Sequence, residues 1–318
     1  MTRRGTGDAQ PAAFHAGDRV LVTGASGFLG RHVCSRLLAA AVEVHAVSRV
    51  PRTDGAERVH WHQAELEDEE ATRRLVAEVK PGAVVHLGGL VNGAPELRFV
   101  IPTFRSLLAS TVHLLTAAAE TGRPRVLLVG SLEEPRAEST ETWPTSPYGA
   151  AKWAASEYGR MFNKVFGLPV VIARTHMTYG PGQPAWKVIP YTIHSLLRGD
   201  RPRLSSGRRA LDWVYVDDVA DGLVLAASTP GLDGATVELG SGTLTSIREI
   251  VTKLVALVAP SVEPLFEALP DRPRDGERAA DIALTRNLMG WTATTPLDEG
   301  LARTVDWYRT LAAAEVQA

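Results

Sequence analysis

The sequence predicts an α/β protein built on a doubly wound, parallel sheet, with a smaller α/β region in its second half. Two observations indicate this fold: short apolar runs alternate with longer amphipathic segments, and a glycine-rich turn follows the first apolar run. Strands and helices that alternate at this spacing are typical of parallel strands joined by crossover helices.

The candidate strands are apolar runs with little polar alternation, as expected when helices cover both faces of a sheet. They are residues 20–22, 42–47, 83–87, 126–129 and 170–173. The helix-like segments between them include residues 32–40, 69–79 and 104–120. The second half is less regular, because prolines interrupt residues 181–204 and a polar stretch covers residues 270–278. We expect loops there.

The composition is that of an ordinary globular protein: 45% of the 318 residues are hydrophobic and 22% are charged. The formal net charge of −2 argues against a nucleic-acid or anionic-membrane partner. Residues 1–17 show no periodicity and are expected to form a flexible tail. No apolar run reaches 18 residues, so no spanning helix is expected. The single cysteine, Cys34, excludes an internal disulfide and fits a cytoplasmic location.

The glycine-rich turn has the spacing of a dinucleotide-binding site. Gly24 permits a tight turn, Gly27 lets the backbone approach a pyrophosphate, and Gly30 lets the helix and strand pack closely. The start of the following helix then offers N–H groups and the positive end of its dipole to phosphate. The expected cofactor contacts of this turn are Gly24, Ser26, Gly27, Phe28, Leu29 and Gly30.

The end of the second strand bears on the choice of cofactor. An acidic residue there would bind the adenosine ribose hydroxyls and favour NAD. This chain has Ser48 and Arg49 instead. Because a guanidinium suits a 2′-phosphate through bidentate charged hydrogen bonds, we expect NADP(H), with NAD(H) as the alternative.

The segment around Tyr148 predicts an acid–base site. Tyr148 and Lys152 are four residues apart and therefore lie on one face of the helix that begins there. A lysine ammonium and a cofactor's nicotinium charge would favour the phenolate and lower the pKa of Tyr148. Ser131, just after the strand at 126–129, is expected to hydrogen-bond the same substrate oxygen. No metal site is expected.

Together these residues resemble the extended short-chain dehydrogenase/reductases, and among them the nucleotide-sugar epimerase/dehydratase/reductase family. The likeness covers residues 18–308. Besides the turn, Ser131 and the Tyr148/Lys152 pair, it rests on Glu65-Leu66, His86-Leu87-Gly88-Gly89, Tyr179-Gly180-Pro181-Gly182, residues 212–218, Arg272-Pro273, Gly290-Trp291 and residues 297–300.

The resemblance implies a Rossmann-type domain over residues 18–175, to which residues 208–236 return, and a substrate-binding region made of residues 176–207 and 237–318. It also implies that the substrate is a nucleoside diphosphate sugar lying against the nicotinamide. Cofactor contacts are implied for Glu65, Leu66, Leu87, Gly88, Gly89, Tyr148 and Lys152. Arg272 is similar to an arginine that contacts the diphosphate or ribose, and Arg209 lies near another anion-contacting position.

Three departures from the family pattern affect the substrate side. Met177 stands where an asparagine is common, Leu211 where an arginine is common, and Leu107 at another position that is often asparagine. We expect contacts to the sugar and diphosphate to differ from the usual ones, with Met177 among the substrate-side residues.

The residues after Ser131 bear on the reaction. A 4,6-dehydratase needs an acid and a base there; Leu132 cannot protonate a departing hydroxyl, whereas Glu133 occupies the base-like position and is a substrate-side candidate. The segment 130–134 is similar to that of 4-keto-6-deoxy sugar nucleotide reductases. We therefore favour NADPH-dependent reduction of a nucleotide-linked 4-keto-6-deoxyhexose. The alternatives are an NAD-dependent nucleotide-sugar 4-epimerase and a non-catalytic NADP-binding protein.

The resemblance also implies pairing of two copies. Family members often form a four-helix bundle from two long helices of each copy. Residues 104–120 and 148–166 are the expected helices, so we expect a homodimer.

Overall fold

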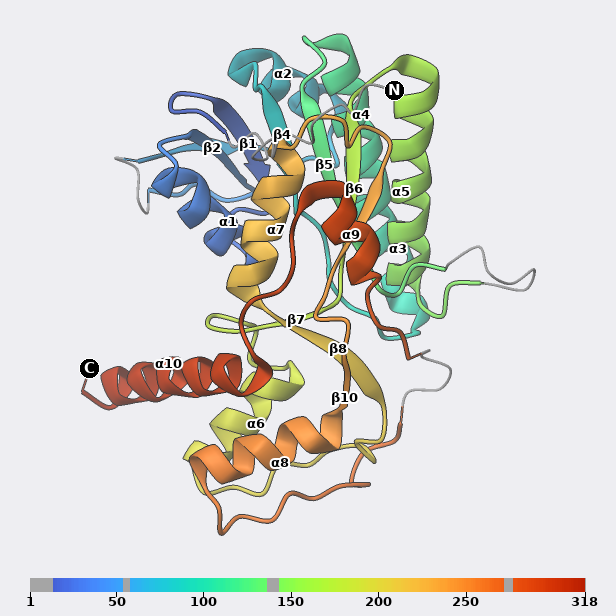
Figure 1. Ribbon diagram of the computed structural model, residues 1–318. Helices are drawn as coiled ribbons and strands as arrows, with labels where there is room; N and C mark the ends of the chain where they lie inside the picture. Colours follow the sequence, from blue (N-terminus) through green and yellow to red (C-terminus); the bar gives the residue numbers. More distant parts are fainter. Residues whose placement is uncertain (1–13, 54–57, 136–142, 272–276, 318) are drawn as a thin grey trace, which may run out of the picture.

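The computed structural model describes residues 14–53, 58–135, 143–271 and 277–317. A large sheet with helices on both faces lies above a smaller lobe built mainly from the second half of the chain (Figure 1). Arg272 falls outside the described residues, so its predicted contact with the substrate stays a prediction.

The large sheet confirms the predicted doubly wound α/β fold. Its seven strands are all parallel and follow the order β3-β2-β1-β4-β5-β6-β9. They are β1 (Arg19–Thr23), β2 (Glu43–Ser48), β3 (Val59–Gln63), β4 (Ala83–His86), β5 (Arg125–Ser131), β6 (Val170–Thr175) and β9 (Thr236–Leu239). The strand order reverses between β1 and β4, the point at which such sheets bind ligands beyond their carboxyl ends.

Apolar side chains fill both spaces between the sheet and its helices. One face is covered by α1 (Phe28–Ala39) and α7 (Val216–Ser228), which bury Leu37 and Leu223. The other is covered by α2 (Glu69–Val79), α4 (Ser110–Glu120) and α5 (Pro147–Phe166), which bury Leu75, Leu114 and Phe162. Because both faces are covered, the strands show the continuous apolar runs from which they were predicted.

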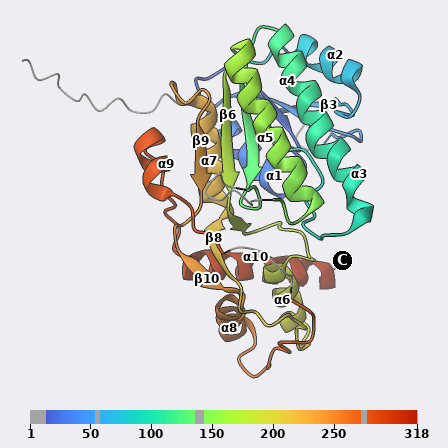
Figure 2. The ribbon, with the colours of Figure 1, turned by 90° about the vertical axis from the view of Figure 1, so that its right-hand side faces the viewer.

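The smaller lobe has its own sheet and its own core (Figure 2). Strand β8 (Ala210–Tyr215) pairs parallel with β7 (Met177–Tyr179) and antiparallel with β10 (Leu244–Ser246). The helices of this lobe are α6 (Val188–Leu197), α8 (Ile247–Val258) and α10 (Leu297–Gln317). Tyr179, Trp213, Ile189, Leu254 and Leu301 form its apolar centre.

The segment expected to return to the first domain, 208–236, is divided between the two sheets. Strand β8 belongs to the smaller sheet, whereas α7 covers the large one. Strand β9 completes the edge of the large sheet and extends past residue 236. Helix α9 (Ile282–Met289) is fastened to this edge, because the Thr285 hydroxyl donates to the Glu238 carbonyl and accepts from the Glu238 N–H.

Local sequence signals explain the helix that carries Tyr148. Ser146 is its N-cap, and the Ser146 hydroxyl accepts from the Gly149 N–H at 3.0 Å. Pro147 fits the first turn, where its missing N–H costs no hydrogen bond. Gly167 ends the helix in the left-handed region at φ +67°. These signals fix where α5 begins, and therefore where Tyr148 and Lys152 lie.

The helical stretch Leu97–Glu120 combines η1 (Leu97–Phe99), α3 (Val100–Thr103), the π-helical η2 (Phe104–Ala109) and α4. By length and composition alone it could cross a membrane, although the core helix of a soluble protein passes the same test. The prediction from sequence considered only unbroken apolar runs, and this stretch contains polar residues. It therefore did not include a helix that could span a membrane. In the structure its α4 part packs Leu114 and Leu115 into the core beside the sheet.

Candidate active site

The glycine turn brings β1, the start of α1 and the end of β4 into close contact. Gly24 has φ +66°, and a Cβ there would lie 2.8 Å from the Gly88 nitrogen. A Cβ on Gly30 would lie 2.2 Å from the Gly24 carbonyl oxygen. The N-cap residue, Gly27, has no side chain to accept from the first helical N–H groups. The turn therefore has the backbone shape and the donors that a pyrophosphate needs.

The strand end beside this turn is held by a buried histidine. The ring Nδ1 of His86 lies 2.7 Å from the Thr23 hydroxyl, and its Nε2 lies 3.0 Å from the Thr111 hydroxyl. The Thr23 hydroxyl also accepts from the Gly88 N–H at 3.1 Å. Burial, helped by the Lys152 ammonium, lowers the pKa of His86 to about 3, so the ring is neutral and joins β1, β4 and α4.

The other residues of the predicted turn face different surroundings. Phe28 and Leu29 are partly buried against the apolar core of the smaller lobe. The Ser26 carbonyl accepts from the Arg31 guanidinium at 3.0 Å, which braces the turn against α1. The turn therefore contacts both lobes.

The predicted adenosine-binding residues lie at the carboxyl ends of β2 and β3. Ser48 is buried, and its hydroxyl accepts from the Val50 N–H at 3.3 Å. Arg49 is exposed, so its guanidinium is available to a ligand at this edge. Glu65 is also exposed, whereas Leu66 packs against the core beneath α2 and α4.

The predicted catalytic residues come together at the end of β5 and the start of α5. Ser131 is the last residue of β5, and its hydroxyl lies near enough to the Tyr148 phenol to affect its pKa. The Lys152 ammonium donates to the Val129 carbonyl at 2.7 Å, which fixes the lysine against the same strand. All three side chains are buried. A substrate oxygen placed at the Tyr148 hydroxyl would therefore also lie near Ser131.

Burial changes the pKa of both ionisable residues of this pair. It lowers the pKa of Lys152 to about 8, against the opposing attraction of Glu134. It raises the pKa of Tyr148 well above its usual value; the Ser131 hydroxyl opposes this rise, and the charges of Glu133 and Glu134 add to it. In the protein without cofactor these contributions leave Tyr148 protonated, and the lowering expected from Lys152 together with a nicotinium charge stays a prediction.

Glu133 links Ser131 to the first turn of α5. Its N–H donates to the Ser131 hydroxyl at 3.2 Å, and its carboxylate accepts from the Ser146 hydroxyl at 2.9 Å. A Cβ on Gly93 would lie 2.6 Å from this carboxylate, so the chain after β4 passes directly beside it. Glu133 is half-buried, and its charge acts on Tyr148. Glu133 therefore lies beside Ser131 and Tyr148, and its contact with substrate stays a prediction.

The loop after β4 meets the π-helical segment. Gly89 has φ +139°, and a Cβ there would lie 2.1 Å from the Leu107 side chain. Leu107 is 2% exposed and forms a small apolar cluster with Tyr148 and Ala151. The predicted cofactor contacts Leu87, Gly88 and Gly89 thus lie on the path from the glycine turn to Tyr148.

Two predicted substrate-side residues belong to the smaller lobe. Met177 begins β7 and is partly buried against the core of that lobe. Arg209 precedes β8, is half-buried, and its carbonyl accepts from the Ile247 N–H at 3.0 Å. The structure therefore does not place them in the cluster of Ser131, Glu133, Tyr148 and Lys152.

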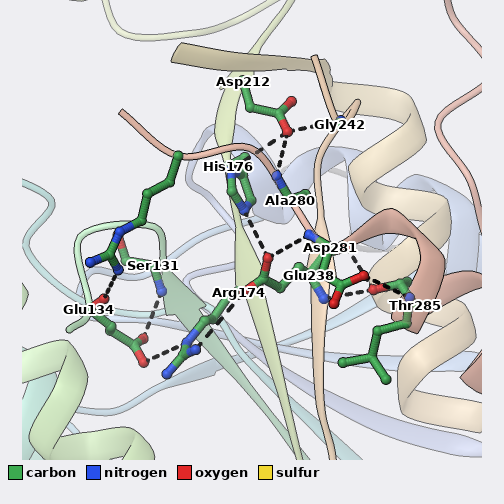
Figure 3. Close-up of polar contacts among 12 residues, drawn as sticks. Ser131, Glu134, Arg174, His176, Asp212, Glu238, Gly242, Ala280, Asp281 and Thr285 are labelled. Carbon is green, nitrogen blue, oxygen red and sulfur yellow. Dashed lines mark hydrogen bonds and ion pairs between the residues drawn. The ribbon is translucent and has the colours of Figure 1, made fainter. Parts of the chain in front are cut away.

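Sequence reasoning missed a row of ionisable side chains in the junction between the lobes (Figure 3). Its members, here called the junction row, are Glu134, Arg174, Glu238, His176 and Asp212. They lie on four separate segments of the chain, with Arg174 and His176 on the same one, so no spacing in the sequence marks the row. Only Glu134 and Asp212 fall inside motifs that the sequence analysis used. Among the described residues, no group of three or more His, Cys, Asp or Glu is arranged to hold a metal ion.

Comparison with known proteins identifies the family of the chain. Residues 20–240 match the model of the NAD dependent epimerase/dehydratase family. The chain is 29% identical to UDP-glucose 4-epimerase of Mycolicibacterium smegmatis, over 92% of this chain and 98% of that protein. It is also 29% identical to dTDP-glucose 4,6-dehydratase of Neisseria gonorrhoeae, over 91% and 95% of the two chains.

Solved structures give the same result. UDP-glucose 4-epimerase of Thermotoga maritima, solved with UDP-glucose, superposes with a TM-score of 0.84 at 25% identity, covering 92% of this chain and 99% of that one. MoeE5 in complex with UDP-glucose and NAD superposes with a TM-score of 0.83 at 29% identity, covering 93% and 100%. Both the resemblance and the fold are confirmed, and the chain belongs to the NAD dependent epimerase/dehydratase family of extended short-chain dehydrogenase/reductase enzymes.

Proposed function

We propose that this enzyme transfers a hydride at a sugar carbon of a nucleotide-linked hexose, and that the reaction is the NADPH-dependent reduction of a 4-keto-6-deoxyhexose. The buried contact between Ser131 and Tyr148 beside Lys152 is the observation that carries the proposal. A bound nicotinamide cofactor supplies or accepts the hydride. Tyr148 donates its proton to the ketone oxygen, which Ser131 orients by a hydrogen bond.

The protonation states of the pair fit reduction. Because burial raises the pKa of Tyr148, its phenol holds a proton at neutral pH and is ready to give it up. Lys152, with a pKa of about 8, is mostly charged at neutral pH and favours the phenolate that this step leaves behind. Reduction needs this direction of proton transfer.

Two further residues favour reduction over dehydration and NADPH over NADH. Leu132, next to Ser131, has no proton to give to a departing hydroxyl. The exposed Arg49 at the end of β2 suits a 2′-phosphate. We propose the glycine turn, Ser48, Arg49, Glu65 and Leu66 as the cofactor contacts, and Arg209, Arg272, Glu133 and Met177 as the substrate side.

A nucleotide-sugar 4-epimerase is the second candidate, because the Mycolicibacterium smegmatis relative is one and aligns over nearly its whole length. The same residues would serve it, with Tyr148 moving a proton in both directions. An epimerase returns the hydride to the same carbon and so consumes no cofactor. Net use of NADPH separates the two reactions.

The decisive experiment follows the oxidation of NADPH with a nucleotide-linked 4-keto-6-deoxyhexose, beside a parallel assay that interconverts UDP-glucose and UDP-galactose without added cofactor. We expect NADPH oxidation, and a loss of about 10²–10⁴-fold in kcat in Tyr148→Phe with unchanged cofactor affinity. Tyr158→Phe is the matched control, because Tyr158 lies on the exposed face of the same helix. Interconversion without NADPH use would replace reduction by epimerisation.

The quaternary structure and location are part of the proposal. Large apolar side chains are exposed on the helices expected to pair, among them Phe104, Trp153 and Phe166. A second copy covering them would give a homodimer, and we expect it in the cytoplasm. Light scattering at micromolar concentration that gives the mass of one chain would rule out the dimer.

A further inference from the structure

The junction row is almost completely enclosed. Side-chain exposure is 0% for Glu134, 13% for Arg174, 8% for Glu238, 1% for His176 and 0% for Asp212. The row runs from the turn after β5, across β6 and β9, to β8 of the smaller lobe (Figure 3). It therefore crosses the boundary between the two lobes.

Neighbouring members of the row lie within ion-pair distance. Arg174 Nε is 3.1 Å from Glu134 Oε2, and Arg174 Nη1 is 4.0 Å from Glu238 Oε1. His176 Nε2 is 3.5 Å from Glu238 Oε2, and its Nδ1 is 3.8 Å from Asp212 Oδ2. Each positive or imidazole group lies between two carboxylates, so the order of the row alternates.

One end of the row holds the catalytic serine. Glu134 Oε1 accepts from the Ser131 N–H at 2.7 Å, and the Glu134 N–H donates to the Ser131 carbonyl at 3.1 Å. A Cβ on Gly130 would lie 2.5 Å from this carboxylate oxygen, so the residue before Ser131 must be glycine for the carboxylate to fold back. The turn at Ser131 is therefore closed by a charged acceptor.

The other end holds the segment 277–281 of the substrate side. Asp212 Oδ2 accepts from the Ala280 N–H at 2.9 Å, and Glu238 Oε2 accepts from the Asp281 N–H at 2.8 Å. The same segment returns to the first end, since the Arg278 guanidinium donates to the Glu134 carbonyl at 3.4 Å. Both ends of the row are thus anchored on backbone groups.

Such a row is a costly way to fill an interior. Taking three carboxylates out of water is unfavourable unless each is paired and hydrogen-bonded, and apolar side chains of similar volume would pack as well or better. What charged groups add is a defined geometry, because each of the three carboxylates accepts from a particular backbone N–H. We therefore look for the role of the row in the backbone groups that it holds, at Ser131 and in the segment 277–281.

We propose that the junction row positions Ser131 for the reaction: Glu134 holds the Ser131 backbone, and Arg174, Glu238, His176 and Asp212 hold the Glu134 carboxylate in register with the segment 277–281. The inference rests on the proposed function, in which Ser131 orients the substrate oxygen. Glu134 is a positioning residue. Through the row, the smaller lobe fixes the conformation of the turn at Ser131 before substrate binds.

The first test measures hydrogen exchange at the Ser131 amide by NMR in the full-length protein. Glu134→Ala should raise this exchange rate at least about tenfold, because the acceptor of the N–H is lost. The amide of Leu128, inside β5, should not change. Glu157→Ala, which removes an exposed carboxylate on α5, is the control. A Ser131 amide that stays equally protected in Glu134→Ala overturns the proposal.

The second test is a double-mutant cycle on kcat with the substrate of the proposed function. Ser131→Ala should lower kcat about 10²-fold or more. Glu134→Ala should lower kcat at least tenfold without weakening cofactor binding, and the double variant should be no slower than Ser131→Ala. Effects that multiply would mean that Glu134 acts apart from Ser131, which overturns the proposal. Glu134→Leu, which is of similar size and has no acceptor, takes the place of alanine if that variant does not fold.

The third test examines the far part of the row. His176→Leu removes both ring nitrogens at similar volume, and it should raise exchange at the Ser131 and Ala280 amides together. A rise at Ala280 alone would overturn the claim that the row connects the two ends. If Ser131→Ala itself leaves kcat unchanged, the proposed function fails, whereas the exchange measurements still decide whether the row holds the turn.

Discussion

The centre of the large sheet and the junction between the lobes bury different kinds of side chain: apolar ones in the sheet and ionisable ones in the junction. Val22, Val85 and Leu127 are fully buried in three adjacent strands, and the ionisable side chain at their carboxyl end, His86, is uncharged. The junction instead buries the three carboxylates, the arginine and the histidine of the junction row. Apolar contacts spread their stabilisation over many residues, whereas the junction depends on a few specific pairs.

The largest expected effect comes from breaking the junction at its arginine. Arg174→Met leaves the Glu134 and Glu238 carboxylates without their shared cation, so the free energy of unfolding should fall by about 3–5 kcal/mol. Arg198→Met, which removes an exposed partner of Asp200, should cost at most about 1 kcal/mol. Urea unfolding measures both. Equal losses would show that the junction is no more sensitive than the surface.

A smaller effect is expected where the sheet meets the glycine turn. In Gly30→Ala the new Cβ meets backbone atoms of Gly24 and Ala25, which cannot move without displacing the turn. We expect a loss of about 1–3 kcal/mol in the free energy of unfolding and a much weaker affinity for NADPH. In Gly82→Ala the nearest atom to the new Cβ lies 3.7 Å away, so this control should bind NADPH normally. Calorimetric titration compares the two variants.

The smallest expected effect depends on pH and belongs to His86. Its pKa is about 3 in the folded protein and about 6.5 when unfolded. Between these values the unfolded chain binds more protons, so stability falls as the pH drops through this window. The slope is at most about 1.4 kcal/mol per pH unit. Urea unfolding between pH 7 and pH 5 should show a steeper slope in the parent than in His86→Gln, because His45 and His62, whose pKa values burial also lowers, keep part of it in both proteins. Parallel curves would mean that His86 is not the group responsible.

Local signals account for the parts of the fold and site that the sequence predicted. The glycine turn and the start of α5 are each specified within a few residues, by Gly24 and Gly30 and by Ser146 and Pro147. Strand β3 was missed because polar residues alternate in Val-His-Trp-His-Gln, as suits the edge of the sheet rather than its buried centre.

The missed parts depend on contacts between distant residues. Nothing near His176 in the sequence indicates that Glu238 and Asp212 flank its ring. The raised pKa of Tyr148 was missed for the same reason, since burial under Leu107 and the charges of Glu133 and Glu134 appear only in the folded chain. The segment 208–236 was expected to rejoin the first domain as a whole. Its strand β8 instead belongs to the smaller sheet, because it pairs with β7 and β10, which lie far from it in sequence.

The buried position of Cys34 has a practical consequence for labelling. The sequence contains one cysteine, and burial raises the pKa of its thiol to about 12. At neutral pH this thiol is neither ionised nor accessible, so maleimides and similar reagents should leave the native protein unmodified. A cysteine introduced on the surface would then be the single reactive position. Fluorescent or spin probes could be attached there without first removing Cys34.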